Sequence, residues 1–223
     1  MIGSPRVHFR VTDSTNERGR ALAAAGAPHG TLVTADEQRA GRGRQGRAWT
    51  APPRSAVLMS VVLRELSETL PLAAAVAVCE ALPVEASIKW PNDVWIDGRK
   101  VAGILVEGRP QEGWAVLGIG LNVATEEFPA ELSATSLRLE GAALSPEDAL
   151  AAVVSALRLW LPRPAAEVLA AWRSRDALCG HPVRWSNGSE EGVAAGVDDS
   201  GALIVETRDG RVTLDAGEVH LER

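Results

Sequence analysis

The chain has 223 residues and a formal net charge of −6, with 46% hydrophobic and 23% charged residues. This size suits one medium domain, alone or with a small appendage, and the composition excludes a disordered chain. The acidic charge argues against general nucleic-acid binding, no apolar run reaches the roughly 20 residues of a membrane span, and no secretory signal is visible. The two cysteines form no metal-type pair. We therefore expect a cytoplasmic protein.

The hydrophobic pattern of the first 178 residues predicts a domain in which strands and helices are mixed. Strands are expected at residues 7–11, 30–35, 55–63, 86–90, 94–96, 100–107 and 113–123. Helices are expected at residues 17–25, 70–82, 145–161 and 164–177. The Ala-rich helix at 70–82 is apolar on almost every side, so we expect it to be buried.

The pattern changes near residue 179 to short strands separated by turn residues. Strands are expected at residues 182–185, 191–197, 202–207 and 211–215. Asn-Gly and Asp-Gly pairs between them are typical of hairpin turns. The sequence thus predicts a domain at 1–178 and a small β-barrel module at 179–223.

Polar residues gather at the start of the first predicted helix. Asp13, Ser14 or Thr15 can cap it, because their side-chain oxygens accept hydrogen bonds from free backbone amides. The same hydroxyl groups, with Asn16, can also hold a polar ligand group at the helix start. Both interpretations, a cap alone and a ligand site, stay open for this segment by itself.

An arginine- and glycine-rich loop follows the second predicted strand. Three glycines alternate with three arginines in it: Gly41, Arg42, Gly43, Arg44, Gly46 and Arg47. Glycine lets the backbone approach a ligand closely, and arginine suits carboxylates and phosphates. The loop is thus either a mobile cover for an anionic ligand or a solvated basic loop.

A second constellation surrounds a predicted hairpin at residues 89–108. It contains two lysines, an asparagine, an aspartate and an arginine: Lys89, Asn92, Asp93, Arg99 and Lys100. Asp97-Gly98 is a common hairpin turn, and hairpin lysines usually face water, which is the plain alternative. In the next strand, Gly118 and Gly120 indicate close approach of a ligand or another backbone.

Four motifs, in this order, resemble those of the biotin–protein ligases, the biotin–acetyl-CoA-carboxylase ligases. They are DSTN at 13–16, EQRAGRGRQGRAW at 37–49, KWPNDVWIDGRKVAGILVE at 89–107 and GIGLNV at 118–123. The resemblance covers essentially the whole chain. It implies an α/β fold with a mixed-sheet catalytic domain, flanking helices and an SH3-like C-terminal barrel. Many members carry an N-terminal helix-turn-helix domain. Since DSTN begins at Asp13, we expect a short form that binds no DNA.

The resemblance also implies a two-step reaction with biotin and ATP as substrates and Mg²⁺ as cofactor. The biotin carboxylate attacks the α-phosphate and gives biotinyl-5′-AMP and pyrophosphate. A lysine amine of a biotin carboxyl carrier domain then attacks the mixed anhydride. The first step joins two anions, so it needs dense positive charge. A closing loop would keep water from the adenylate.

Roles follow from the resemblance residue by residue. The ureido ring of biotin is assigned to Ser14, Thr15, Asn16 and Gln38. The biotin tail and phosphate are assigned to the loop, with Gly41, Arg42, Gly43, Arg44 and Arg47. The nucleotide side is assigned to Lys89, Asn92, Asp93 and Asn122. Trp49 would cover the adenylate, and Gly103 and Gly118 would let biotin approach the strands. Lys100, Arg44 and Asp93 are the expected catalytic residues, with Asp93 a candidate Mg²⁺ contact.

Two rival functions remain. A lipoate or octanoate ligase or transferase shares the general fold, although the loop and KWPND favour biotin. A non-enzymatic nucleotide-binding regulator belongs to a different class. Members of the family often dimerise through sheet edges, and the sequence leaves both a monomer and a homodimer open.

Overall fold

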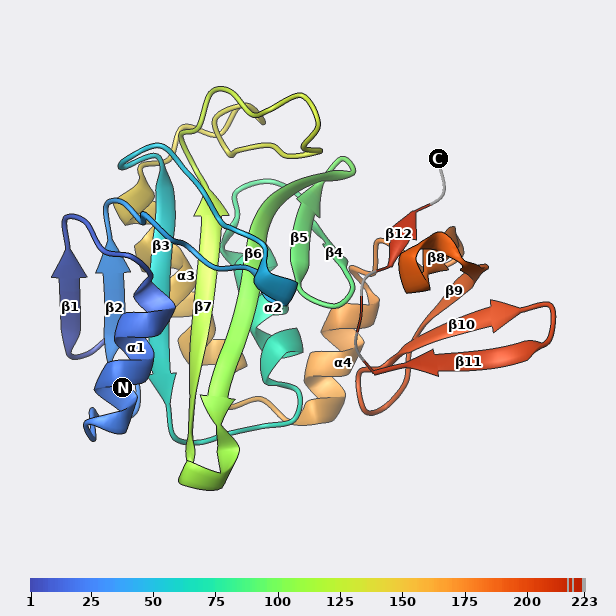
Figure 1. Ribbon diagram of the computed structural model, residues 1–223, viewed down its shortest axis with the longest axis horizontal. Coiled ribbons are helices and arrows are strands. Elements are labelled where there is room, and N and C mark those ends of the chain that lie inside the picture. The colour runs from blue at the N-terminus through green and yellow to red at the C-terminus, as the bar shows by residue number, and fades with distance from the viewer. Residues whose placement is uncertain (216, 218, 222–223) are drawn as a thin grey trace.

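A computed structural model describes residues 1–215, 217 and 219–221, without the side chains at positions 110 and 187. Positions 216, 218, 222 and 223 of the predicted β module lie outside the described residues. The larger part of the chain is built on a seven-stranded mixed sheet with the strand order β1-β2-β3-β7-β6-β5-β4 (Figure 1). Only β1 and β2 pair in parallel; the other neighbours are antiparallel. The predicted α/β class with a mixed sheet is confirmed.

The strand bounds agree with the predicted ones to within two residues. They are β1 (Arg6–Phe9), β2 (Leu32–Ala35), β3 (Ala56–Leu63), β4 (Ser87–Lys89), β5 (Asp93–Ile96), β6 (Arg99–Arg109) and β7 (Trp114–Asn122). Every residue of β3 is buried, as its unbroken apolar run predicts for a central strand.

Helices cover both faces of this sheet. α1 (Thr15–Ala24) lies on one face, and α2 (Leu70–Ala81) and α3 (Pro146–Trp160) lie on the other (Figure 1). α2 is sandwiched between the sheet, α3 and α4 (Ala165–Arg173), so its uniform apolar surface is buried as expected. α4 ends at Arg173, four residues before the predicted end, because Arg175 and Ala177 instead form backbone hydrogen bonds with Ile88 of β4.

The C-terminal part forms a separate five-stranded antiparallel sheet, which confirms the small β module. Its order is β11-β10-β9-β8-β12. The bounds are β8 (Pro182–Trp185), β9 (Glu190–Val197), β10 (Leu203–Thr207), β11 (Gly210–Leu214) and β12 (His220–Leu221). β12 was not predicted, because two residues carry no periodic pattern. In the part of the chain that is described, no helix is long and apolar enough to cross a membrane.

Side-chain hydrogen bonds join the two sheets. The indole nitrogen of Trp90 donates to the carbonyl oxygen of Gly201 at 3.0 Å, and Arg173 binds the carbonyl of Val197 and the carboxylate of Asp199. Asp176 lies at this junction, where its Oδ1 accepts from the amide of Leu178 at 2.8 Å. Within the described part of the chain its buried Oδ2 has no hydrogen-bond partner, and burial raises the pKa of the Asp176 carboxyl.

This buried carboxyl should make stability depend on pH. Since the pKa of Asp176 is higher in the folded than in the unfolded state, the folded state binds more protons between the two values. The free energy of unfolding therefore falls as the pH rises through that interval. Asp176→Asn should remove this contribution, so it should be more stable than wild type at pH 7 and its stability should vary less with pH. Urea unfolding between pH 4 and 8 measures it, with the exposed Asp209→Asn as control. An unchanged pH slope in Asp176→Asn would contradict the assignment.

Candidate functional site

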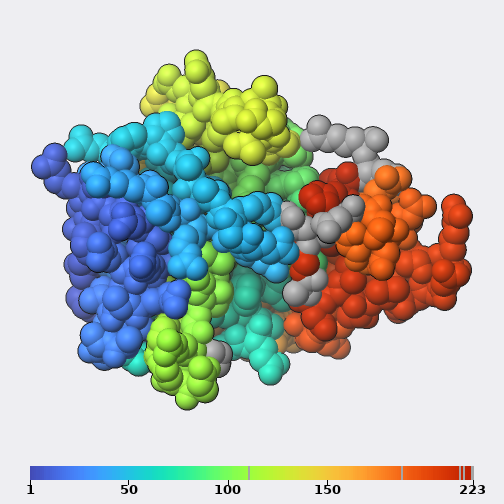
Figure 2. Space-filling view, in the orientation of Figure 1, coloured from blue at the N-terminus to red at the C-terminus, as the bar shows by residue number. Residues whose placement is uncertain are grey.

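A cavity of about 280 Å³ lies on the face of the sheet that carries α1. Its walls come from the start of α1, the loop at 42–49, β6, β7, the turn at 90–93 and the segment 128–134. In Figure 2 the segment near residue 45 lies on the surface between the main domain and the C-terminal module. All of the sequence-predicted site residues line this cavity except Gly41. The structure therefore brings together residues separated by more than 100 positions, while their roles stay predictions.

The cavity is strongly basic, against the net charge of the chain. Five basic side chains line it: Arg42, Arg44, Arg47, Lys89 and Lys100. Among the described lining residues the only carboxylate is that of Asp93. A partly enclosed site with this balance favours an anionic ligand, since low dielectric strengthens the attraction.

Hydrogen-bonded side chains form the end of the cavity at α1. Gln38 Oε1 accepts from the amide and the hydroxyl of Thr15, at 2.7 and 3.0 Å. Ser60 on β3 lies behind them, with its hydroxyl 2.8 Å from Thr15 Oγ1 and 2.6 Å from Asn16 Oδ1. Ser14 caps α1, accepting from the amide of Glu17 at 3.4 Å, and also lines the cavity. The cap and the site interpretations are thus compatible.

The glycines of the central strands make room for protein side chains. A Cβ at Gly118 would lie 2.1 Å from Asn16 Oδ1, and one at Gly120 would lie 2.3 Å from Cε2 of Trp49. A Cβ at Gly103 would lie 3.1 Å from Cζ3 of Trp49. Gly103 and Gly118, which the resemblance assigns to close approach of biotin, both line the cavity. Their missing Cβ atoms also make room for Trp49 and Asn16, which line the cavity as well.

Backbone hydrogen bonds close the arginine- and glycine-rich loop. Trp49 donates to the carbonyl of Gly41 at 2.9 Å, and Gly43 donates to that of Arg47 at 2.7 Å. Between them lies a single 3₁₀ turn, η1 (Arg44–Gly46), with Gln45 at φ 54°. A Cβ at Gly41 would lie 2.3 Å from the carbonyl oxygen of Trp49. Gly41 therefore shapes the base of the loop rather than the cavity wall.

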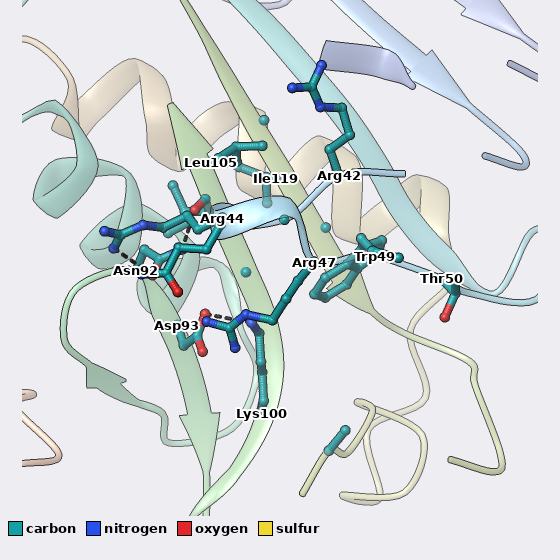
Figure 3. Close-up of a pocket in the computed structure, with 18 of the residues that line it drawn as sticks. Arg42, Arg44, Arg47, Trp49, Thr50, Asn92, Asp93, Lys100, Leu105 and Ile119 are labelled. Atoms are coloured by element: carbon teal, nitrogen blue, oxygen red, sulfur yellow. Dashed lines mark hydrogen bonds and ion pairs between the residues drawn. The ribbon is translucent and has the colours of Figure 1, made fainter. Parts of the chain in front are cut away.

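The basic side chains of the loop point in different directions (Figure 3). Arg44 reaches across the cavity to Asn92, with its Nη1 3.3 Å from Oδ1. Arg47 points toward Asp93 and Lys100, whereas Arg42 points away from that pair. Arg42, which the resemblance assigns to the biotin tail and phosphate, lines the cavity, and its Nη2 lies 3.0 Å from Oε1 of Glu107.

Lys100 is fixed on both its backbone and its side chain. Its ammonium lies 2.6 Å from Asp93 Oδ1 and 5.6 Å from the ring centroid of Trp49. Its backbone pairs with the segment 133–135, donating to Ser133 and accepting from Thr135, both at 2.9 Å. The indole N–H of Trp49 is buried and has no hydrogen-bond partner among the residues that the structure describes. A rigidly held cation beside an unpaired donor suits an oxygen-rich ligand.

The residues present are compatible with one magnesium ion carried by a phosphate ligand. Mg²⁺ usually takes one or two carboxylates together with substrate phosphates. Asp93 supplies one carboxylate to the cavity. Within the described chain there is no group of three or more His, Cys, Asp or Glu residues that could hold a metal alone. The donor set thus fits a phosphate-bound ion and no dedicated protein cage.

Sequence reasoning missed several residues of the site. Ser60 sits inside an apolar run, and its burial among polar partners could have been suspected only from the sheet register. Phe128 and Leu132 come from the irregular segment, and Gly217 and Val219 reach the cavity from the C-terminal module. No local pattern marks such contacts, because they depend on how distant elements pack.

Comparisons with known proteins agree with this geometry. Residues 8–123 match the biotin/lipoate A/B protein ligase family, and residues 183–221 match the biotin protein ligase C-terminal domain. A biotin–[acetyl-CoA-carboxylase] ligase of Paracoccus denitrificans is 37% identical, over 93% of this chain and 97% of the relative. The bifunctional ligase/repressor BirA of Bacillus subtilis is 34% identical, over 99% of this chain and 75% of the relative. The solved biotin protein ligase of Aquifex aeolicus in complex with biotin and ATP has a TM-score of 0.85 and 28% identity, with 99% of each chain covered.

The fold and the cavity thus define a member of the biotin/lipoate A/B protein ligase family, to which the chain belongs. Within that family, its C-terminal match and its relatives place it among the biotin protein ligases, which are enzymes. The resemblance drawn from the four motifs is confirmed.

The contact between Gly118 and Asn16 gives a direct test of the site's architecture. Gly118→Ala should force Asn16 out of its position and lower the free energy of unfolding by about 1–3 kcal/mol, the usual cost of overpacking. Adding Asn16→Ala to Gly118→Ala should recover most of the lost free energy of unfolding, because the side chain that clashes with the new Cβ is gone. Urea unfolding of both single variants and of the double variant measures this. If the stability losses of Gly118→Ala and Asn16→Ala simply added in the double variant, the contact between these two positions would be contradicted.

Proposed function

We propose that the protein is an ATP-dependent biotin–protein ligase. It activates biotin as biotinyl-5′-AMP with release of pyrophosphate, and then transfers biotin to a lysine of a biotin carboxyl carrier domain. The observation that carries the proposal is the cavity itself, with hydrogen-bonding groups at one end and five basic side chains with one carboxylate along the rest. The names of its relatives support biotin as the acyl substrate.

The polar end of the cavity suits the ureido ring of biotin. The ring offers one carbonyl acceptor and two N–H donors, and Ser14, Thr15, Asn16 and Gln38 carry both donor and acceptor atoms. The apolar side chains of Met59, Ile104 and Ile119 also line the cavity and suit the thiophane ring and the aliphatic tail. The tail then directs the biotin carboxylate toward Lys100.

In the first step the biotin carboxylate oxygen attacks the α-phosphorus, and the bond to pyrophosphate breaks. Both reactants are anionic, so positioned cations lower the barrier by offsetting their repulsion. Lys100 is placed to contact both the carboxylate and the α-phosphate. Arg44 and Arg47 bring further positive charge from the loop. Mg²⁺ bound to the phosphates would neutralise the leaving pyrophosphate, and Asp93 is the residue that would contact it.

In the second step the carrier lysine amine attacks the acyl carbon, and AMP leaves with the electron pair of the broken bond. The adenylate has to survive until the carrier arrives, so water has to be kept away. The loop at 41–49 and the indole of Trp49 are positioned for this. We also place the boundary between the catalytic domain and the C-terminal module at 178/179, a division supported by the two separate sheets.

Biotin-dependent release of pyrophosphate from ATP and Mg²⁺ tests the first step, and transfer onto a purified carrier domain tests the second. Thermal shifts with biotin and with lipoate distinguish a biotin ligase from a lipoate or octanoate ligase or transferase, since a ligand that binds only the folded protein raises its melting temperature. No pyrophosphate release would exclude the ligase, and a preference for lipoate would favour the lipoate or octanoate class.

Lys100→Ala should lower the rate of adenylate formation by about 10²–10³-fold, the usual effect of removing one transition-state electrostatic contact. The fold should persist, since the side chain is partly exposed and adds little core packing. The neighbouring Arg99→Ala is the matched control, because Arg99 pairs with Glu140 outside the cavity and should keep its rate. Near-normal turnover of Lys100→Ala would refute its catalytic role.

Arg44→Ala should weaken binding of biotin and of ATP and should release the adenylate early. The expected loss is about tenfold, because an arginine hydrogen-bonded across a half-buried site contributes roughly 1–2 kcal/mol. Single-turnover measurement of adenylate retention checks it. Arg39→Ala, an exposed arginine just before the loop, is the control, and a normal off-rate in Arg44→Ala would argue against a closing loop.

A further inference from the structure

Glu107 is the last residue of the third motif and has no role in the proposed chemistry. It lies on β6 with its side chain 19% exposed and does not line the cavity. Even so, its carboxylate has three partners. Oε2 accepts from Asn16 Nδ2 at 2.9 Å, and Oε1 lies 3.0 Å from Arg42 and 3.7 Å from Arg20.

These contacts join the two ends of the site. One partner, Asn16, belongs to the polar end of the cavity and is held by Ser60 through its Oδ1. The other main partner, Arg42, belongs to the loop. The amide group of Asn16 is therefore oriented by Ser60 on one side and Glu107 on the other. A ligand that fixes Asn16 will also fix the carboxylate that holds the loop.

Gln38 adds a second link between the loop and the polar end. It precedes the loop and accepts two hydrogen bonds from Thr15, whose hydroxyl contacts Ser60. A continuous polar chain thus runs from Gln38 through Thr15, Ser60, Asn16 and Glu107 to Arg42. Such networks are cooperative in partly buried surroundings, because each hydrogen bond polarises the next. Among the described residues in this network, Glu107 alone carries a carboxylate.

We propose that Glu107 is a positioning residue that anchors the loop through Arg42 and couples its closure to occupancy of the polar end. The coupling rests on the proposed function, in which that end receives the biotin ring, whereas the anchoring does not. The coupling is reciprocal. If the bound ligand favours the ordered loop, then the ordered loop raises the affinity for the ligand by the same factor. Removing the charge of Glu107 should therefore loosen the loop and weaken biotin binding while leaving the reacting groups at Lys100 in place.

Limited trypsin digestion measures the loop directly, because Arg44 and Arg47 are cleavage sites within it. Without substrates, Glu107→Gln should be cleaved after these arginines about fivefold faster than wild type, as expected for loss of a partly exposed ion pair. Biotin should protect the wild-type loop and protect Glu107→Gln less. The control is Glu112→Gln, which removes the carboxylate of an exposed Arg109 pair at the turn of the same β6–β7 hairpin. Cleavage of Glu107→Gln at the control rate would overturn the proposal.

Kinetics give a second, independent readout. Glu107→Gln should raise the KM for biotin about fivefold and change the maximal rate of pyrophosphate release less than twofold, whereas simple misfolding would lower the active fraction and leave KM unchanged. In the digestion assay, Arg42→Gln and the double variant should be cleaved after Arg44 and Arg47 as fast as Glu107→Gln, because removing either partner breaks the same contact. Additive effects in the double variant would overturn the coupling. If biotin does not protect even the wild-type loop, the proposed function fails, while faster cleavage of Glu107→Gln without biotin still supports the anchor.

Discussion

Repulsion between two anions is the constraint that the proposed reaction places on this structure. In that reaction a carboxylate and a triphosphate have to meet within bonding distance, in a protein whose own net charge is −6. The chain meets this by concentrating five basic side chains around one cavity and admitting a single described carboxylate, that of Asp93, which is paired with Lys100 at 2.6 Å. Positive charge held in place before the reactants arrive needs no reorganisation during the reaction, which is why rigid placement matters more than the number of charges.

The sheet supplies that rigidity. Lys100 is the second residue of β6 and Asp93 begins β5. The two strands pair with each other, with Asp93 opposite Gly103 and Trp95 opposite Lys100, so the sheet holds the two charges close together. The backbone of Lys100 is held a second time by the segment 133–135. Glycines at positions 103, 118 and 120 then let Asn16 and Trp49 lie flat against the strands. The same central strands thus serve as the wall of the cavity and as the frame for its charges.

Much of this could be predicted from the sequence, for definable reasons. The strands of the main sheet, the buried α2 and the capped start of α1 follow from local periodicity and helix capping. The site residues came from four motifs, in which residue type and spacing are dictated by one chemistry. The predictions that failed concern features set by contacts between residues far apart in the sequence. α4 was predicted too long because its end is set by pairing with Ile88, and β12 and the contributions of Ser60 and Val219 exist only through tertiary packing.

The direction of Arg42 shows where motif reasoning reaches its limit. Alternating arginines in a loop appear equivalent in sequence, but in the structure their side chains point in different directions and have different partners. Arg44 and Arg47 lie toward Asn92, Asp93 and Lys100, and Arg42 points away from them (Figure 3); its Nη2 lies 3.0 Å from the Glu107 carboxylate. The proposed closing loop needs one fixed attachment beside its mobile part, and a carboxylate outside the cavity can hold an arginine without competing with the proposed anionic ligand. Placing Glu107 on β6, behind the cavity wall, meets both requirements.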